Sequence, residues 1–406
     1  MALSVASNSL SGVVSEVKFS RLSRLKLLDM AANAFIIDVN SHWIPPFQLQ
    51  MISISSCKLG PKFPAWLQTQ KSLTYLDISK ARLVDAAPDW FWNFAACVKY
   101  IKLSNNAISG DLSSVLLNSS FIDLSSNHFR GQLPLISPHI TMYNVANNSF
   151  SGPISPSICS VVNLESKLEV MDLSRNNLSG DLPDCWRHWQ SLLHLNLGSN
   201  ILSGKIPNSL GSLLRLQSLH LANNSLFGDI PHSLKNCKDL KLIDLGVNQL
   251  AGNIPNWMGE WTRVLQLRSN KFSGNIPPQI CQISSLIVLD FSNNSLSGSI
   301  PKCLNNISAM VASDNWHNDE YGSLDHNYDY GLYLENLMLM TKGKESEYTK
   351  NLGYLRTTNL SSNNFSGSIP TEIFLFAKLQ SLNLSQNHLI GKISKDVGSM
   401  KSLEIT

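Results

Sequence analysis

The sequence predicts an α/β solenoid, a stack of short coils in which each coil adds one strand to a parallel sheet. Two consecutive windows, Leu192–Arg215 and Leu216–Asp239, repeat one frame, L-x-L-x-x-N-x-L-x-G-x-I-P-x-x-L. Asn200 and Asn224 occupy the asparagine of that frame, so the period is 24 residues. Self-similarity at a period of roughly 20–50 residues is the sequence signature of a repeat architecture, because one unit cannot bury its apolar face alone.

The same period runs along nearly the whole chain. Successive copies lie 21 to 28 residues apart, except for one step of 69, and two copies carry a degenerate residue in place of the asparagine. This frame is that of a leucine-rich repeat. We therefore expect an α/β leucine-rich-repeat solenoid of about fifteen 24-residue repeats, a curved right-handed superhelix with a parallel β-sheet on its concave face. The copies are indexed by Asn8, Asn33, Cys57, Ala81, Asn106, Asn127, Asn148, Asn176, Asn200, Asn224, Asn248, Asn270, Asn294, Asn363 and Asn387.

Each part of the frame has a physical reason. The L-x-L segment, for example Leu195–Leu197, alternates apolar and polar residues, which predicts a short strand with its leucines facing the core. The asparagine turns the chain and can bond backbone groups of adjoining coils through both ends of its amide. A glycine recurs four residues later, where a tight backbone needs no Cβ, and a proline recurs after seven, where it fixes φ on the way to the convex side.

Composition excludes several functional classes. The formal net charge of +3 is near neutral for 406 residues, and Lys and Arg are not clustered, so a nucleic-acid partner has no electrostatic footprint. The apolar runs are too short to span a bilayer, and the first residues lack the pattern of a secretion signal. Neither end carries a recognisable capping coil. We therefore expect a fragment of a longer chain, with a membrane anchor only in the full-length protein.

Four of the seven cysteines recur at the same offsets in the frame, eleven residues after the asparagine in one coil and nine in the next. Neighbouring coils are about 5 Å apart, which is within Cα reach of a disulfide. We predict the disulfides Cys159–Cys185 and Cys281–Cys303; the alternative is four buried free thiols. The other three, one in the asparagine slot and two expected in the core, are Cys57, Cys97 and Cys237.

Nine N-x-[ST] sequons occur, some of them a by-product of the N-N-S and N-L-S wording of the repeat. Several fall beside the structural asparagine or on an outward strand position, where a glycan could stand in solvent. Together with the predicted disulfides they favour a secretory route. The candidate N-glycosylation sites are Asn118, Asn147, Asn177, Asn223, Asn293, Asn306, Asn359, Asn364 and Asn383.

One insertion interrupts the repeat. The 69-residue step from Asn294 to Asn363 is one period plus 45 residues, so we expect leucine-rich repeats at 1–308, an island insert at 309–353 and C-terminal repeats at 354–406. The first half of the insert is rich in acidic and aromatic residues and has no Lys or Arg between Ser313 and Glu335. Loops of this length are more often functional or disordered than idle.

The island resembles that of plant receptor-like proteins, because it leaves through Pro301–Leu304 and returns through Thr341–Tyr348. The G-x-[IL]-P element with its 24-residue period likewise resembles plant extracellular leucine-rich repeats. In that family the island lies beside the concave face and shapes ligand or co-receptor binding. The resemblance implies a ligand-recognition ectodomain on the extracellular face of the plasma membrane, which signals through a co-receptor leucine-rich-repeat kinase, commonly in defence. The alternative for the acidic, aromatic tract is a solvated loop.

Outward strand positions and the island supply the candidate binding residues, since outward side chains are free to specify a peptide, protein or glycan partner and Tyr and Trp suit interface anchors. The outward positions considered are Tyr75, Asp77, Lys80, Tyr100, Lys102, Asp172, Arg175, His220, Asp244, Gln266, Arg268 and Asp290. The ligand-binding candidates are Asp172, Arg175, His220, Asp244, Arg268, Asp290, Trp316, Tyr321, Tyr328 and Tyr330. Arg175 and Arg268, each with an aspartate nearby, are the first targets for mutagenesis.

Enzyme signatures do not occur: the sequence has no phosphate-binding loop, no zinc-protease or nucleophile-elbow motif and no kinase set, and its ten His are scattered. We therefore expect no catalysis, no cofactor and no metal. Three alternatives to the receptor-like ectodomain stay open. They are the ectodomain of a receptor kinase, a secreted inhibitor of cell-wall hydrolases, and a truncated non-functional remnant.

Overall fold

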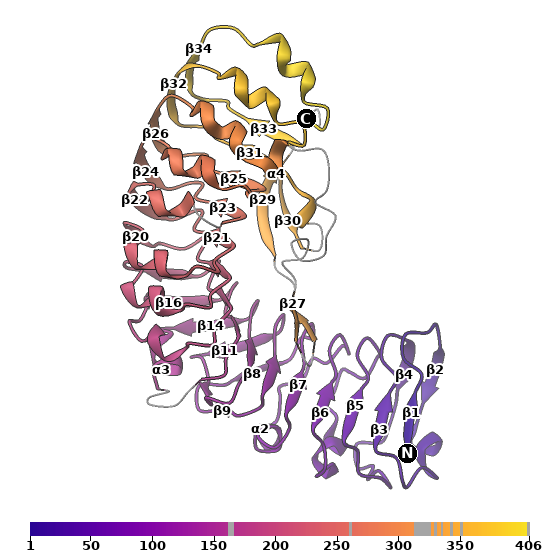
Figure 1. Ribbon diagram of the computed structural model, residues 1–406. Helices are drawn as coiled ribbons and strands as arrows, with labels where there is room; N and C mark the ends of the chain where they lie inside the picture. Colours follow the sequence, from indigo (N-terminus) through magenta and orange to yellow (C-terminus); the bar gives the residue numbers. More distant parts are fainter. Residues whose placement is uncertain are drawn as a thin grey trace. The chain divides into compact units, whose positions relative to one another are not determined.

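The structure is a computed structural model that describes residues 1–160, 166–259, 262–311, 326–328, 331–333, 336–341, 344–349 and 352–403 (Figure 1). Its chain packs into two compact units, Met1–Ile201 (unit 1) and Leu202–Thr406 (unit 2). The repeat pattern runs through this boundary without a change, so the sequence does not predict it.

Unit 1 holds nine short parallel strands, one per coil, paired in the order of the chain. Their register places equivalent frame positions side by side, as in the pairing of Ile101 with Ile122 and of Ile122 with Tyr143. The strands are β1 (Ala2–Ser4), β3 (Leu27–Asp29), β5 (Met51–Ser53), β6 (Tyr75–Asp77), β7 (Tyr100–Lys102), β10 (Phe121–Asp123), β13 (Met142–Asn144), β15 (Val170–Asp172) and β17 (His194–Asn196).

Unit 2 holds six strands of the same kind, β19 (Ser218–His220), β21 (Leu242–Asp244), β23 (Val264–Gln266), β25 (Val288–Asp290), β31 (Thr357–Asn359) and β33 (Ser381–Asn383). Strand β25 pairs directly with β31, Val288 opposite Thr357, so the intervening residues leave the sheet between two adjacent coils. The described residues of that interval form two short antiparallel hairpins: β27 (His326–Tyr328) with β28 (Gly331–Tyr333), and β29 (Leu337–Thr341) with β30 (Lys344–Tyr348).

After the asparagine most coils continue through a second strand, and most then form a helical turn. The second strands are β2 (Ser11–Val14), β4 (Ala34–Ile37), β8 (Ser109–Asp111), β11 (His128–Gly131), β14 (Ser149–Gly152), β16 (Asn177–Asp181), β18 (Ile201–Ser203), β20 (Phe227–Gly228), β22 (Gln249–Asn253), β24 (Lys271–Gly274), β26 (Ser295–Gly298), β32 (Asn364–Ser368) and β34 (His388–Ile390). In two successive coils a further strand, β9 (Leu116–Leu117) or β12 (Leu135–Ile136), takes the place of the helical turn, and these two strands pair with each other.

The helical turns begin where the sequence places its prolines. Pro207, Pro231, Pro277, Pro301 and Pro370 each precede a 3₁₀ turn with φ between −62° and −74°. The turns are α1 (Glu16–Phe19), η1 (Ala65–Thr69), α2 (Asp89–Ala95), α3 (Ser155–Ile158), η2 (Trp186–His188), η3 (Asn208–Ser212), η4 (His232–Asn236), η5 (Asn256–Gly259), η6 (Pro278–Gln282), η7 (Lys302–Asn306), α4 (Ser308–Val311), η8 (Leu352–Tyr354), η9 (Thr371–Leu375) and η10 (Lys395–Ser399).

The asparagine ladder behaves as its chemistry predicts. The Nδ2 of Asn270 donates to the carbonyls of Leu267 and Arg268 in its own coil at 3.1 and 3.2 Å, and to that of Leu245 in the preceding coil at 3.0 Å. Its Oδ1 accepts from the backbone N–H of Leu250 at 2.9 Å. The predicted bonding through both ends of the amide is confirmed, and these bonds keep the buried backbone groups of adjoining coils paired.

Cys57 takes the place of the asparagine in its coil. Its Sγ donates to the carbonyl of Met30 in the preceding coil at 3.2 Å, a bond that Nδ2 makes elsewhere in the ladder. Burial raises the pKa of the Cys57 thiol, so the group stays protonated and keeps its donor. The substitution therefore preserves one inter-coil bond of the asparagine but supplies no amide oxygen.

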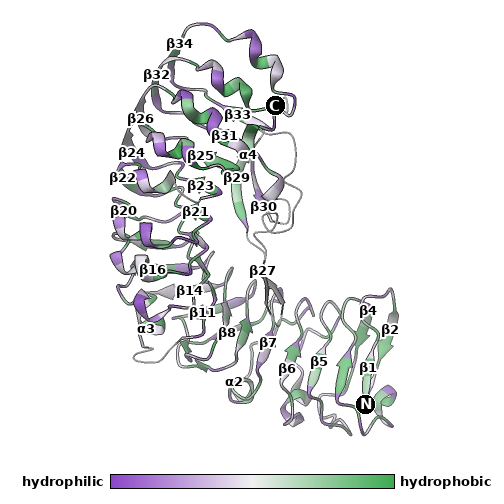
Figure 2. Cartoon of the chain, in the orientation of Figure 1, coloured by the Kyte–Doolittle hydropathy of each residue, from purple (hydrophilic) through white to green (hydrophobic). Residues whose placement is uncertain are grey.

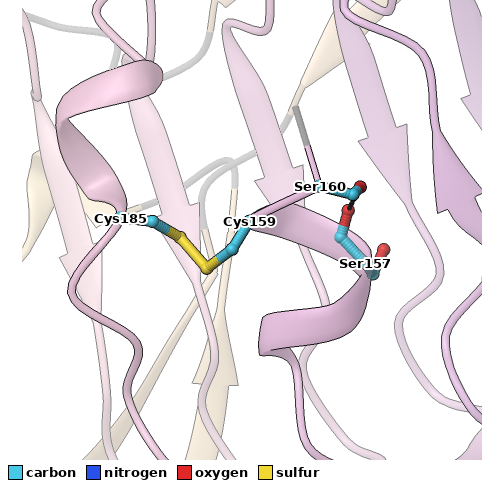
Figure 3. The surroundings of a disulfide bond; sticks show 4 residues. All are labelled: Ser157, Cys159, Ser160 and Cys185. Carbon is cyan, nitrogen blue, oxygen red and sulfur yellow. Dashed lines mark hydrogen bonds between the residues drawn. A yellow bond between two sulfur atoms is a disulfide. The ribbon is translucent and has the colours of Figure 1, made fainter. Parts of the chain in front are cut away.

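Disulfides join adjacent coils at two places. Cys159 follows α3 and bonds Cys185, with their Cα atoms 5.7 Å apart; nearby, the hydroxyl of Ser160 donates to the carbonyl of Ser157 (Figure 3). Cys281 and Cys303 form the second bond, with Cα atoms 5.5 Å apart. The two bonds are those that the repeated offsets predict. They fasten one outer turn to the next in each unit.

Candidate ligand-binding surface

A column of polar side chains follows the ends of the strands in unit 2. His220, Asp244, Gln266 and Asp290 close strands β19, β21, β23 and β25 and lie directly opposite one another in the register. We call these four residues the strand-end column. All four are buried, and the Nδ1 of His220 lies 3.9 Å from Oδ2 of Asp244. The column thus brings together three of the predicted binding residues with Gln266, an outward residue outside that selection.

The aspartates of this column have a structural task. Oδ1 of Asp290 accepts from the backbone N–H of Ser292 at 3.0 Å and from its hydroxyl at 2.6 Å. Asp172 bonds Ser174 in the same way, at 3.0 and 2.6 Å. Each aspartate thus uses one carboxylate oxygen to turn its own chain, and its part in ligand binding stays a prediction.

Asp244 follows the same rule with a glycine in place of the serine. Its Oδ1 accepts from the backbone N–H of Gly246 at 3.2 Å. A Cβ on Gly246 would lie 3.1 Å from Cγ of Arg268 in the next coil. Gly246 therefore makes room for an arginine side chain that crosses it from the neighbouring coil.

Arg268 is unusual for its position in the frame. At the equivalent place, three residues after the inward strand leucine, the other fourteen coils carry Gly, Ala or Ser, as at Gly246, Ser292 and Ser361. The Arg268 guanidinium forms an ion pair with the carboxylate of Glu345 in β30. The Arg268 side chain is 13% exposed and that of Glu345 is 45% exposed, so the ion pair lies at the edge of the surface that β30 and its hairpin cover.

Hairpin β29–β30 is held on the inner face of unit 2 by this ion pair and by a hydrogen bond. The Nε2 of Gln266 donates to the carbonyl of Met338 at 3.0 Å. Figure 1 draws β29 and β30 beside β23 and β25, and Figure 2 colours β29 largely hydrophobic and β30 largely hydrophilic. One strand of the hairpin thus turns to the sheet while the other carries polar side chains.

Apolar packing completes the attachment of the hairpin. Leu337 and Leu339, 1% and 2% exposed, join a buried cluster with the first residues of β21, β23 and β25, which are Leu242, Val264 and Val288. These strand residues belong to the face that carries the strand-end column, since alternate residues of a strand point the same way. Burying two leucines stabilises the hairpin by roughly 3–6 kcal/mol before conformational entropy is counted.

Burial sets the electrostatics of this surface. It raises the pKa of Asp290, with the bonds from Ser292 and the charge of Arg268 opposing the rise and the charge of Asp244 adding to it. Arg268 therefore lies within electrostatic reach of Asp290 while its ion pair is with Glu345. The arrangement gathers one guanidinium among several carboxylates, which suits a surface that discriminates by charge.

Unit 1 places its predicted residues differently. Asp172 is buried in β15, whereas Arg175 is exposed in the following turn with φ +55°. Further along the inner face, the ring of Tyr100 stacks on Tyr75 and on Phe121, with centroids 4.1 Å apart in both pairs. The faces of these stacked rings cover one another, which indicates that the rings pack adjacent strands together.

The aromatic residues chosen from the island fall largely outside the described residues. Trp316, Tyr321 and Tyr330 lie there, and of Tyr328 only the backbone, in β27, is described. Their role stays a prediction. Eight of the nine sequon asparagines are exposed; Asn359 is half-buried, and its Oδ1 accepts from Ser361.

The sequence analysis missed Glu345 and the two leucines that seat the hairpin. A signal for the leucines was present, because residues 337–340 form a short continuous apolar run, which is consistent with a buried strand. Nothing in the sequence pairs Glu345 with Arg268. Among the described residues, no group of His, Cys, Asp or Glu could hold a metal ion, and no helix is long and apolar enough to cross a membrane.

Sequence comparison finds repeats and receptors. Leucine-rich-repeat family models match residues 166–226 and, separately, 262–283, 285–307, 354–376 and 378–400. The chain is 45% identical to receptor-like protein EIX2 of Solanum lycopersicum over 91% of its own length, and 43% identical to receptor-like protein EIX1 of the same plant over 90%. It spans little more than a third of these relatives, 37% and 36%.

Structural comparison finds the same architecture. The leucine-rich-repeat ectodomain of the Arabidopsis thaliana receptor kinase GASSHO1/SCHENGEN3, solved with CASPARIAN STRIP INTEGRITY FACTOR 2, matches 99% of this chain and 46% of that chain, with a TM-score of 0.71 and 26% identity. The plant peptide hormone receptor RGFR1, solved with RGF2, matches 99% of this chain and 61% of that chain, with a TM-score of 0.73 and 22% identity, which speaks for the fold alone.

Proposed function

The chain belongs to the leucine-rich-repeat receptor-like proteins of plants, and from that premise we propose that it is a ligand-recognition segment of such a receptor's ectodomain. The ligand is a peptide, protein or glycan that binds the inner face of unit 2 beside hairpin β29–β30. The observation that carries this proposal is the attachment of the hairpin to three adjacent strands through Gln266, Arg268 and the leucine cluster.

Attachment of the hairpin supports a recognition role for a physical reason. A loop that is fixed before binding loses little conformational entropy when a partner arrives, so its contacts contribute more fully to affinity. The hairpin presents Met340, 42% exposed, and Glu345 at the margin of the inner face. An apolar side chain beside a charged one gives a partner both buried area and a charge to match.

Signalling in this proposal passes through other proteins. The chain is not an enzyme, because leucine-rich repeats of this family bind rather than catalyse. We propose a co-receptor leucine-rich-repeat kinase as its signalling partner, a place at the extracellular face of the plasma membrane, and a role in defence. A peptide or protein ligand has support from the neighbouring ectodomain of GASSHO1/SCHENGEN3, which was solved in complex with CASPARIAN STRIP INTEGRITY FACTOR 2. The receptor kinase ectodomain is the second candidate, favoured by that same neighbour.

Direct binding measurements test the proposed site. The full chain is screened by biolayer interferometry against a defined panel of extended peptides and oligosaccharides. Each binder is then measured against Glu345→Lys, which reverses the exposed charge beside the inner face, and against Lys235→Glu, a matched reversal on η4. We expect at least tenfold weaker binding for Glu345→Lys and no change for Lys235→Glu. A ligand that binds all three proteins equally would place recognition elsewhere.

A further inference from the structure

Unit 1 contains a pocket that lies apart from the surface described above. It has a volume of about 430 Å³ and lies between the chain that follows β4 and the chain that leads into η1. Its lining residues are 36–41 from one coil and 58–66 from the next. Pockets of roughly 300–1,000 Å³ are the usual size for small-molecule sites.

The pocket arises where the repeat frame lapses. The second coil has Ile37 where most other coils have the glycine and Asn40 where most have the proline. The chain at Asp38–Asn40 forms no helical turn, whereas the third coil enters η1 after Pro64. The two outer segments therefore differ in shape, and the pocket lies between them.

Apolar and aromatic side chains form much of the pocket wall. Ile37 and Trp66 are buried, and Phe63 is half-buried. The indole Nε1 of Trp66 is buried and has no hydrogen-bond partner among the described residues. Because this nitrogen is buried, the Trp66 ring offers the pocket apolar surface rather than a hydrogen-bond donor.

The pocket also carries charged side chains, which a cavity formed only by imperfect apolar packing would lack. Lys58 and Lys62 are exposed along the segment from the third coil, and Asp38 is exposed on the other wall. The backbone N–H of Asp38 donates to the carbonyl of Val14 at 3.0 Å, which fixes that wall to the preceding coil. Two ammonium groups and one carboxylate leave the pocket with a net positive charge.

We propose that this pocket binds a small amphipathic anion, with the apolar body against Ile37, Phe63 and Trp66 and the acidic group near Lys58 and Lys62. The apolar wall supplies burial, and the ammonium groups supply charge complementarity. The site is independent of the inner face of unit 2, so either proposal can fail without the other.

Isothermal titration of the full chain with 4-phenylbutyrate tests the proposal, with the uncharged 4-phenylbutanol as the paired probe. We expect a dissociation constant on the order of 0.1–1 mM for the anion, because a dozen heavy atoms give modest affinity. The alcohol should bind at least fivefold more weakly. Raising the salt concentration should reduce the difference in affinity between the anion and the alcohol, since exposed charges are screened.

Variants locate the binding. Ile37→Trp fills the pocket and should abolish binding, and Lys58→Met with Lys62→Met should weaken it at least tenfold. Lys71→Met, an exposed lysine outside the pocket, is the matched control and should change nothing. The proposal is overturned if the anion and alcohol bind equally, if neither binds, or if the filled variant binds as the wild type does.

Discussion

Arg268 and Glu345 form an ion pair across 77 residues of sequence, from a turn of the repeat to a strand of the island hairpin. The arginine stands where the other coils have small residues, and Gly246 in the adjacent coil leaves space for its side chain. The pair therefore depends on two departures from the repeat, a large residue at position 268 and an insertion that returns to meet it, together with a small residue in the adjacent coil.

Breaking this pair should loosen the hairpin without unfolding the coils. Because Glu345 is nearly half exposed, we expect Arg268→Ala to lower the local stability of β29–β30 by only about 0.5–1 kcal/mol. Amides of the hairpin should then exchange with solvent about two- to fivefold faster, measured by hydrogen–deuterium exchange. Lys271→Ala, an exposed lysine bonded to Gln249, serves as the control. Unchanged exchange in the hairpin would mean that the leucine cluster alone holds it.

The structural asparagine should matter far more than its neighbour. Asn363 donates to the carbonyls of Phe291, Leu360 and Ser361 and accepts from the N–H of Leu296, and so bridges the coils on either side of the island. We expect Asn363→Ala to destabilise unit 2 by about 2–4 kcal/mol, because it leaves several buried backbone groups unpaired.

The matched control is the next residue, Asn364, which is exposed. Asn364→Ala should change the urea midpoint of unfolding by very little, since surface substitutions usually fall within about 0.5 kcal/mol. Equal effects of the two variants would contradict the role assigned to the asparagine ladder.

Two glycines at the same place in two helical turns should respond oppositely to alanine. A Cβ on Gly211, the fourth residue of η3, would lie 2.3 Å from the carbonyl oxygen of Ser233, whereas Gly398 in η10 has open space. We expect Gly211→Ala to destabilise by about 1–3 kcal/mol through overpacking. Gly398→Ala should be neutral or stabilise by up to about 1 kcal/mol through the unfolded chain. Thermal and urea unfolding of both variants measure the difference.

Asp290 should make stability depend on pH. Burial raises its pKa in the folded chain above the unfolded value of about 3.9. The stabilising contribution of its protonated form is therefore complete below pH of about 3.9 and is lost as pH rises through the folded pKa. Asp290→Asn should be more stable than the wild type at pH 7 and equal to it near pH 3.

The asparagine keeps the local bonds in that comparison. Asn359 and Asn383 already accept from the serine two residues on, with hydroxyl contacts of 2.8 Å, in the geometry that Asp290 uses. Urea unfolding of Asp290→Asn and wild type at both pH values isolates the charge. A variant less stable than the wild type at pH 7 would show that attraction to Arg268 outweighs burial.

The disulfides should appear in peptide mapping without reductant. We expect linked peptides for Cys159–Cys185 and Cys281–Cys303. Cys97, which is exposed and not in the core as the sequence predicted, should be alkylated in the folded chain, and the buried Cys57 and Cys237 only after unfolding. Reduction should destabilise the chain by roughly 2–4 kcal/mol for each loop closed. Recovery of all four paired cysteines as free thiols would contradict both bonds.

Much of the coil could be predicted because its interactions recur at fixed spacing. The hydrogen bonds from asparagine to backbone, the prolines that precede helical turns and the disulfides between adjacent coils all recur. The interactions of one coil therefore predict those of many others. The bond from Asp290 to Ser292 could have been predicted as well, since the same Asp-x-Ser spacing occurs at Asp77, Asp123 and Asp172. The expectation that these aspartates are available to a partner did not take the strand spacing into account. Strands about 5 Å apart leave outward side chains little room.

The site itself could not be predicted in the same way. Arg268 and Glu345 meet only because the insertion folds back, and no period relates their positions. The pocket beside Trp66 lies where Ile37 and Asn40 replace the glycine and proline of the repeat frame, and that replacement does not by itself predict a pocket. The repeat frame thus predicts the scaffold, whereas the features proposed for binding lie at positions that depart from the frame.

Hydrogen–deuterium exchange of the full chain, with and without a ligand found in the binding screen, tests the central proposal most directly. We expect slower exchange in β21, β23, β25 and hairpin β29–β30, where the inner face and the hairpin would contact the ligand. Protection confined to the outer turns η3–η7, with the hairpin unchanged, would contradict recognition on the inner face of unit 2.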